Sequence, residues 1–210
     1  MVYDTDLDIT WVSDANLFKT QADASGNPAA FVQNIITANG GVIHDPLGVL
    51  SGSDDVWNLS ADDFDTSNGR MSWYGARAWA NSLSYGGVSD WRLPNANPAE
   101  AYFAYESSSE LGHLFYSELG GTAGNNIPDT STFSHEQALQ YWSTGDDYFP
   151  YLFTTSGGFQ SYGINYRTTH FRVWAVRSGD VAAVPLPGAV WLFGTGLLGW
   201  LGAKRRANIR

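Results

Sequence analysis

The sequence predicts an α+β domain followed by a single membrane-spanning helix at the C-terminus. In the first half of the chain, apolar residues recur at spacings of three and four, which is the helical period. Residues 141–177 instead hold aromatic and β-branched runs separated by turn residues, a pattern typical of antiparallel strands. Helices and strands that occupy separate parts of a chain define the α+β class.

The N-terminus begins as a strand, and the period of two would place Asp4, Asp6 and Asp8 on one of its faces. Their D-x-D-x-D spacing is typical of the start of a calcium loop. However, Ile9 stands where an EF-hand needs glycine, and Ala15 stands where it needs a bidentate glutamate. We therefore expect a solvated strand edge or turn, with a calcium site as the alternative.

Two helices are predicted before residue 90. Asn27 and Pro28 supply a cap and a first helical residue for residues 29–39, and Gly40-Gly41 ends that helix. Ser72 is the expected N-cap of the second helix. The apolar face of this second helix is formed by Trp73, Ala76, Trp79, Ala80 and Leu83. Its tryptophans are expected in the core rather than on a ligand surface.

The next stretch combines a short strand with two helical segments. Asp90-Trp91-Arg92-Leu93-Pro94 is predicted to form a short strand that its proline ends. Residues 97–100 supply an N-cap, a first-turn proline and an N3 glutamate, which predict a helical start. Residues 109–119 form another apolar segment before two glycines.

Four strands follow, at residues 141–144, 148–155, 159–165 and 171–177. Their aromatic and β-branched content favours strands, and glycine or threonine pairs separate them. The last run is apolar on both faces, which predicts a central strand.

Charge and cysteine content exclude several functions. The chain has a net charge of −10, and four of its 11 basic residues lie after Ala203. The preceding body therefore holds seven Lys and Arg against 21 Asp and Glu, a net charge of −14. Such a body should repel nucleic acid, anionic headgroups and sulfated polysaccharides. The absence of cysteine excludes disulfides, thiolate metal sites and a cysteine nucleophile.

No catalytic constellation has a convincing spacing, so we expect neither catalytic residues nor a metal-ligand motif. The histidines, at positions 44, 113, 135 and 170, are scattered, and His135 has no second histidine four residues later, as a helical zinc motif needs. No serine lies in a G-x-S-x-G elbow. The acidic cluster of Asp62, Asp63 and Asp65 is typical of a helix start and a solvated loop.

One predicted loop offers the residue types that bind carbohydrate. The candidate ligand residues are Asp146, Asp147, Tyr148, Tyr151 and Tyr162. Sugar rings stack on flat aromatic faces, while carboxylates hydrogen-bond to hydroxyls or hold calcium. Calcium is the cofactor that such a loop could take, and no other cofactor is expected. The alternative is an ordinary hairpin turn flanked by sheet aromatics.

The C-terminal tail has the composition of a membrane anchor. Counted from Val184, its apolar segment has 20 residues, and about 20 residues span the hydrocarbon core of a bilayer. The expected transmembrane helix covers residues 188–203, which carry no charge. The basic residues that follow place the C-terminus in the cytoplasm and the body outside, by the positive-inside rule. A buried core helix is the alternative, but its all-round apolar face and basic end disfavour it.

The tail also carries a resemblance to a known signal. Its Val-Pro-Leu-Pro start, Trp-Leu-Phe-Gly span and basic cluster resemble the PEP-CTERM sorting signal of exported bacterial proteins. The signal residues are Val184, Pro185, Leu186, Pro187, Lys204, Arg205 and Arg206. The resemblance implies export, transient anchoring in the inner membrane, and cleavage by an exosortase-type membrane protease before release to the surface or exterior. The first six residues lack the basic and apolar regions of an export signal, so we expect the true start upstream.

Motifs of the body carry a second resemblance. They are Gly-Arg-Met-Ser-Trp at 69–73, the helix at 76–83, Asp-Trp-Arg-Leu-Pro at 90–94, Tyr-Trp-Ser-Thr at 141–144 and Val-Trp-Ala-Val-Arg at 173–177. Together they are similar to the C-terminal domain family of the Legionella collagen-like adhesin. This resemblance implies a C-type-lectin-like fold, in which an antiparallel sheet is flanked by two main helices, and a role in adhesion or glycan binding.

The expected domain organisation follows from both resemblances. Residues 1–178 form the lectin-like domain, with an insert at about 24–67. Residues 179–183 form a linker, and residues 184–206 form the sorting signal.

The leading hypothesis is an exported, non-enzymatic, lectin-like protein that binds neutral glycan in the envelope or the extracellular matrix. A purely structural envelope or biofilm protein without a small ligand is the second hypothesis, and a carboxylate-based glycosidase is the third. The expected partners are the exosortase-type protease, the inner membrane and extracellular polysaccharide, and not nucleic acid. The sulfated polymers that the adhesin binds are not expected ligands, because a body of charge −14 lacks a basic surface.

Overall fold

The structure, a computed structural model, describes residues 1–44, 56–100, 103–145, 149–162 and 168–181. The fold is that of one compact unit, Met1–Asp180, and the chain beyond it forms a second unit. The predicted transmembrane helix at 188–203 lies outside the described residues. Among the residues that are described, no helix combines the length and apolar character needed to cross a bilayer.

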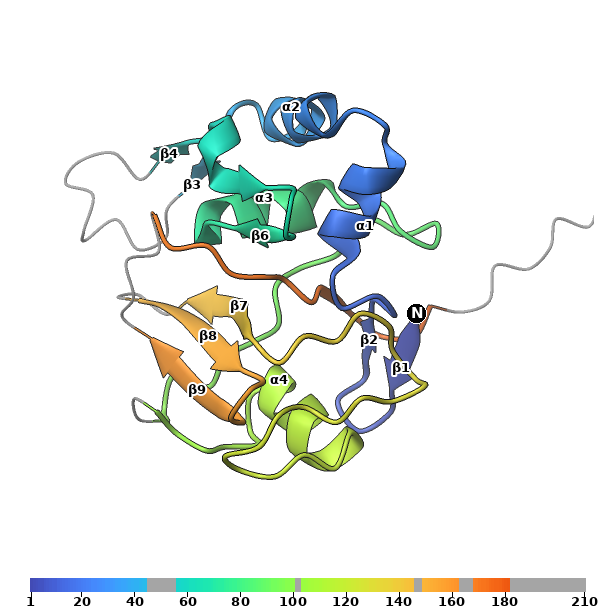
Figure 1. The fold of residues 1–210 in the computed structure, drawn as a ribbon, viewed down its shortest axis with the longest axis vertical. Helices are drawn as coiled ribbons and strands as arrows, with labels where there is room; N and C mark the ends of the chain where they lie inside the picture. The colour runs from blue at the N-terminus through green and yellow to red at the C-terminus, as the bar shows by residue number, and fades with distance from the viewer. Residues whose placement is uncertain (45–55, 101–102, 146–148, 163–167, 182–210) are drawn as a thin grey trace, which may run out of the picture. The chain divides into compact units, whose positions relative to one another are not determined.

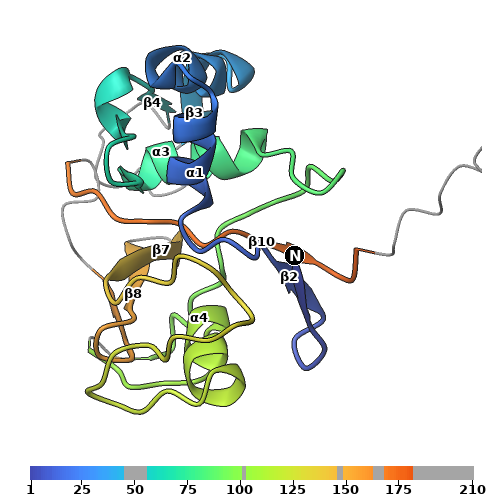
Figure 2. The ribbon, with the colours of Figure 1, turned by 45° about the vertical axis from the view of Figure 1, so that its right-hand side comes forward.

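The two ends of the first unit meet in a three-stranded antiparallel sheet, in which the last strand lies beside the second (Figure 1 and Figure 2). Its strands are β1 (Val2–Asp4), β2 (Ile9–Trp11) and β10 (Val176–Ser178). β2 is the central strand, because it pairs with β1 on one side and with β10 on the other. The pairing of Val176 with Trp11 closes the unit by joining its second strand, β2, to its last strand, β10.

The N-terminal strand is followed by the turn that was one of the two expected alternatives, at residues 5–8, and the prediction that Asp4, Asp6 and Asp8 share a face is wrong. Oδ1 of Asp4 accepts hydrogen bonds from the backbone N–H groups of Asp6 and Leu7, at 3.1 and 3.0 Å. An aspartate that bonds to the backbone two or three residues later stabilises a turn. Asp4 is therefore buried while Asp6 and Asp8 are exposed, and the three aspartates do not share a face.

The residues described before position 90 include three α-helices: α1 (Leu17–Ala24), α2 (Pro28–Ala38) and α3 (Trp73–Ser82). Helices α2 and α3 confirm the two predicted helices and their caps. The Asn27 side chain accepts a hydrogen bond from the N–H of Ala30, and Oγ of Ser72 accepts one from the N–H of Gly75. Helix α1 was not predicted, because it is short and Asn16 makes no side-chain cap.

Short hairpins and one turn of 3₁₀-helix connect α2 to α3. They are β3 (Val42–His44) with β4 (Val56–Asn58), η2 (Ala61–Asp63), and β5 (Phe64–Asp65) with β6 (Arg70–Met71). The acidic cluster starts a helix as predicted, because Ser60 and Asp63 form a capping box for η2. The expected solvation holds for Asp62, which is exposed, but is wrong for Asp63, which is 3% exposed.

The apolar segment at 109–119 forms two joined helices, α4 (Glu110–His113) and the π-helix η3 (Leu114–Glu118). The N–H of Leu119 donates to the carbonyl oxygen of Leu114, five residues earlier, at 3.0 Å. The predicted helical start at 97–100 is wrong. Those residues form a turn, in which the Asn97 side chain accepts a hydrogen bond from the N–H of Ala99.

The second three-stranded antiparallel sheet has the order β7-β8-β9. Its strands are β7 (Gln140–Gly145), β8 (Pro150–Thr154) and β9 (Phe159–Tyr162). They confirm the first three strands predicted after residue 140. The fourth is corrected: before β10, residues 171–175 form only isolated bridges, from Phe171 to Met71 and from Arg172 to Tyr141. This run is apolar on both faces because it passes between β7 and the α3 region, as Figure 1 shows.

Tryptophan dominates the core. Trp11, Trp73, Trp79, Trp142 and Trp174 are among its largest fully buried side chains, which confirms the core positions predicted for two of them. Buried indole N–H groups usually have a hydrogen-bond acceptor. The Nε1–H groups of Trp73, Trp142 and Trp174 donate to backbone carbonyl oxygens at 2.8–3.0 Å. Nearby, burial raises the pKa of the Tyr141 phenol, which therefore stays protonated.

The mixture of helices and antiparallel sheets confirms the α+β class. Within the described residues, however, strand pairing is divided among four small sheets of two or three strands each. One looped sheet flanked by two helices is therefore not what the structure shows, and the C-type-lectin-like topology stays a prediction.

Candidate functional site

The predicted ligand loop lies at the turn between β7 and β8. Residues 146–148, which include three of the predicted ligand residues, lie outside the described part of the chain. The two strands approach closely where the turn begins, since Gly145 pairs with Pro150 after a register shift. A Cβ atom on Gly145 would lie 2.9 Å from the backbone oxygen of Phe149. Glycine is therefore needed for this close approach of the two strands.

Aromatic rings flank this turn. The rings of Phe149 and Tyr162 stack with centroids 5.4 Å apart, and Phe149 is 36% exposed. Tyr151 pairs opposite Tyr162 in the β8–β9 ladder, but its own side chain is buried. The structure thus brings the predicted Tyr151 and Tyr162 together. It adds Phe149, which sequence reasoning missed although it follows directly on the predicted loop.

A cavity of about 240 Å³ borders the same turn. Its lining includes Thr144 and Gly145 of β7 and Trp73 and Arg77 of α3. The contacts that position Arg77 include the Trp73 ring, whose centroid lies 4.9 Å from the guanidinium, and the backbone oxygen of His44, to which the guanidinium donates at 2.6 Å. Ligand pockets typically enclose about 300–1,000 Å³. This cavity can therefore admit one small polar group but cannot enclose an oligosaccharide.

A second exposed aromatic group lies at the other end of β9. Phe103 and Tyr105 are 52% and 60% exposed, and both rings contact that of Phe159. Ala104, between them, forms a bridge with Gln160, so this segment covers the outer edge of β9. Phe103 has a φ of 58°, a conformation that bulky residues seldom adopt. No periodic signal in the sequence marks this group.

The Asp-Trp-Arg-Leu-Pro motif has a structural role. Asp90 forms a bidentate ion pair with Arg177 of β10, at 2.7 and 2.9 Å, and Arg92 forms one with Glu110 of α4, at 2.8 Å for both bonds. The hydrogen-bonded Arg177 guanidinium lowers the pKa of the Asp90 carboxyl. Trp91, which lies between Asp90 and Arg92 in the sequence, has a buried side chain. The motif thus ties β10 and α4 together, and its Arg92 and Leu93 also line the cavity beside the β7–β8 turn.

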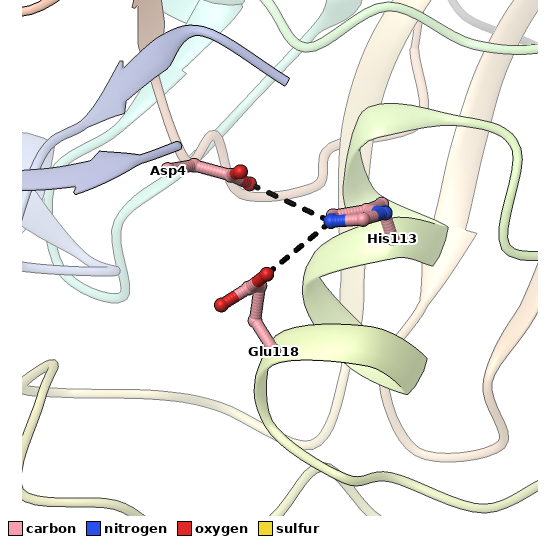
Figure 3. Close-up of side chains that lie close together, drawn as sticks. All are labelled: Asp4, His113 and Glu118. Carbon is pink, nitrogen blue, oxygen red and sulfur yellow. Dashed lines mark hydrogen bonds and ion pairs between the residues drawn. The ribbon is translucent and has the colours of Figure 1, made fainter. Parts of the chain in front are cut away.

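One mixed cluster of imidazole and carboxylate groups lies away from the predicted loop (Figure 3). Nε2 of His113 lies 3.3 Å from Oε1 of Glu118 and 4.0 Å from Oδ2 of Asp4. All three candidate ligand atoms lie within 4.8 Å of one another. Asp4 is 5% exposed, whereas the Glu118 side chain is 41% exposed. The cluster therefore has one buried wall and one side that is open to solvent.

Sequence reasoning missed this cluster for two reasons. Asp4 and His113 are more than 100 residues apart, and no local pattern predicts that they meet. His113 and Glu118 are five residues apart, a spacing that places side chains about 140° apart around an ordinary α-helix. The only usable signal was the aspartate-rich N-terminus, which suggested a cation site without indicating its other ligands.

The fold and these sites define a small, tryptophan-rich α+β domain that precedes an apolar, basic-ended tail. A family model described as the Lcl C-terminal domain matches residues 1–177, and the chain belongs to that family. The model of the PEP-CTERM protein-sorting motif matches residues 183–206. Both resemblances predicted from the sequence are confirmed. No curated protein and no solved structure matches the chain.

The sorting motif also establishes the general fate of the protein. A PEP-CTERM motif marks an exported protein that is anchored in the membrane and then processed by an exosortase. The chain is therefore an exported surface protein that carries an Lcl C-terminal domain.

Proposed function

We propose that the domain binds neutral glycan, without turning it over, at the β7–β8 turn, and that this binding holds the processed protein in the extracellular matrix. The observation that carries the proposal is the stacked pair of Phe149 and Tyr162. In the sequence, Asp146 and Asp147 precede Phe149 by three and two residues. Aromatic faces and hydroxyl-binding carboxylates side by side are what sugar recognition requires.

The charge of the protein supports a neutral ligand. The body carries a net charge of −14, so anionic polysaccharides would be repelled at a distance. The cavity beside the turn supplies polar groups from Arg77 and Thr144 that can meet a sugar substituent. Membership of the Lcl C-terminal domain family and the export motif are consistent with a role at the cell surface.

Removing the aromatic rings at the turn is expected to weaken glycan binding. Phe149→Ala and Tyr162→Ala should each lower the affinity for a neutral polysaccharide by about 10-fold, because each removes stacking worth about 1–1.5 kcal/mol. Asp146→Ala and Tyr148→Ala are expected to have effects of similar size. Binding is measured on a glycan array and by polysaccharide pull-down with residues 1–183, with calcium and with EDTA.

The matched control is Tyr105→Ala, which removes an exposed ring at the opposite end of β9. It should bind glycan as the parent does. Parent-like binding by both Asp146→Ala and Tyr148→Ala would show that the site is wrongly placed. Absence of glycan binding by the parent protein would favour a purely structural envelope protein, and turnover of a polysaccharide panel would favour the glycosidase alternative.

Replacing both Pro185 and Pro187 by alanine is expected to keep the protein in the inner membrane. We expect the exosortase to cleave near these prolines, so their loss should block cleavage but leave the apolar segment intact. Cell fractionation and immunoblotting should then show the full-length species in membranes, with little or none outside the cell. Pro128→Ala, a substitution in the body, serves as the control. An unchanged size and distribution of the double variant would contradict the assignment.

A further inference from the structure

We propose that Asp4, His113 and Glu118 form a binding site for one divalent transition-metal ion, with Zn²⁺ as the favoured ion. This site is separate from the proposed glycan surface and does not depend on it. It would join the β1–β2 hairpin to the segment formed by α4 and η3 (Figure 3).

The π-helix turn brings two of the ligands together. In η3 the backbone hydrogen bonds run between residues five apart, as the bond from Leu119 to Leu114 shows. This pattern places residues five positions apart in the sequence on one face of the helix. The side chains of His113 and Glu118 therefore point toward each other, with 3.3 Å between Nε2 and Oε1. Single π turns inside helices occur frequently at functional sites. A regular α-helix would place these two side chains on different faces.

The third ligand is a buried carboxylate oxygen that lacks a hydrogen-bond donor. Oδ1 of Asp4 accepts two backbone hydrogen bonds, from Asp6 and Leu7, which hold the carboxylate in place. Oδ2 is buried, has no hydrogen-bond partner, and points at Nε2 of His113 from 4.0 Å, which is beyond hydrogen-bond range. A buried and unpartnered carboxylate oxygen is costly, so it needs an explanation. A cation between these three groups would supply one.

The spacing of the ligand atoms suits a small ion. Zn²⁺ binds nitrogen and oxygen at about 2.0–2.2 Å, so tetrahedral ligands lie roughly 3.3–3.5 Å apart. The distance from His113 to Glu118 already has this value, whereas Oδ2 of Asp4, 4.0 Å from Nε2 of His113, must move closer to complete the site. An imidazole ligand favours Zn²⁺ and its neighbours over calcium, which takes oxygen ligands only. Three protein ligands leave one position for water, on the exposed side of Glu118.

The test measures zinc binding by the full chain, purified in a non-ionic detergent with a histidine-free tag and stripped with EDTA. Isothermal titration with Zn²⁺ is expected to show one ion per chain. Saturating zinc should raise the midpoint of thermal unfolding by roughly 5–10 °C, because the ion binds the folded state. Elemental analysis after dialysis provides an independent measure of the stoichiometry.

Two conservative variants remove ligands while keeping the local structure. In Asp4→Asn the amide oxygen can still accept from Asp6 and Leu7, and only the metal-binding oxygen is lost. Glu118→Gln removes the exposed ligand. Loss of groups that merely orient ligands typically costs 10–100-fold in affinity, so loss of a direct ligand should cost about 100-fold or more. Without metal, Asp4→Asn should unfold no earlier than the parent, because it replaces a buried carboxylate oxygen that has no hydrogen-bond donor.

Matched controls distinguish this site from adventitious binding. Asp6→Asn makes the same charge change two residues away on an exposed side chain, and His170→Ala removes another histidine. Both should bind zinc as the parent does. The proposal would be overturned by equal zinc affinity in Asp4→Asn and Asp6→Asn, by no zinc uptake at micromolar concentrations, or by one calcium ion bound in preference to zinc.

Discussion

Replacing Trp174 by alanine is expected to lower the free energy of unfolding by about 3–5 kcal/mol, the usual cost of truncating a large buried aromatic side chain. Trp174 is fully buried, and its ring contacts those of Trp11, Phe133 and Tyr141 at centroid distances of 4.8–5.8 Å. The truncation also leaves the backbone oxygen of Val12 without its indole donor.

Urea unfolding of residues 1–183, followed by circular dichroism, measures this effect. Trp174→Phe serves as a matched variant, since it keeps most of the apolar contact but loses the hydrogen bond to Val12, and it should cost roughly 1–2 kcal/mol. Tyr105→Ala, on the surface, should change stability by less than about 0.5 kcal/mol. A loss below about 1 kcal/mol for Trp174→Ala would mean that the core can be repacked around the gap.

Replacing Asp63 by alanine is expected to lower the free energy of unfolding by about 3 kcal/mol, because one buried and two part-buried donors lose a charged acceptor together. The Asp63 carboxylate accepts from the backbone N–H of Ser60, the hydroxyl of Ser72 and the indole N–H of Trp57. Ser72 in turn caps α3 by accepting from the N–H of Gly75. The loss would therefore affect η2 and the start of α3 at the same time.

The same urea experiment tests this prediction with a control in the same turn. Asp62→Ala removes an exposed carboxylate one residue earlier and should change stability by less than about 0.5 kcal/mol. Asp63→Asn keeps one acceptor oxygen, so its free energy of unfolding should lie between those of Asp62→Ala and Asp63→Ala. Equal stability of Asp62→Ala and Asp63→Ala would show that the hydrogen bonds of Asp63 make no net contribution to the free energy of unfolding.

Much of the fold could be predicted because its signals are local. The caps Asn27 and Ser72 bond to backbone N–H groups three residues ahead, so their effect is readable from a few neighbouring residues. The strands β7, β8 and β9 follow from β-branched and aromatic runs between glycines. The sorting tail is likewise a continuous pattern, and its family match confirms it.

The candidate sites were predicted less completely. Tyr151 and Tyr162 do lie side by side, because antiparallel pairing across a short hairpin follows from the strand assignment. Exposure could not be predicted, so the buried Tyr151 and the exposed Phe149 were not distinguished. The turn at Asp4 and the burial of Asp63 depend on which side-chain oxygen captures a backbone or hydroxyl donor, and residue spacing does not determine this.

The sequence by itself determined the α+β class, the two capped helices, the β7–β9 strands, the family and the export signal. Only the tertiary structure decided that the run before β10 passes through the core, and that Asp4 meets His113 and Glu118. The physical reason is distance along the chain. Periodicity and capping act over about four residues. The burial of the run before β10 and the approach of Asp4 to His113 depend instead on how separate elements pack. The approach of His113 to Glu118 depends on one π turn that breaks the regular helical period.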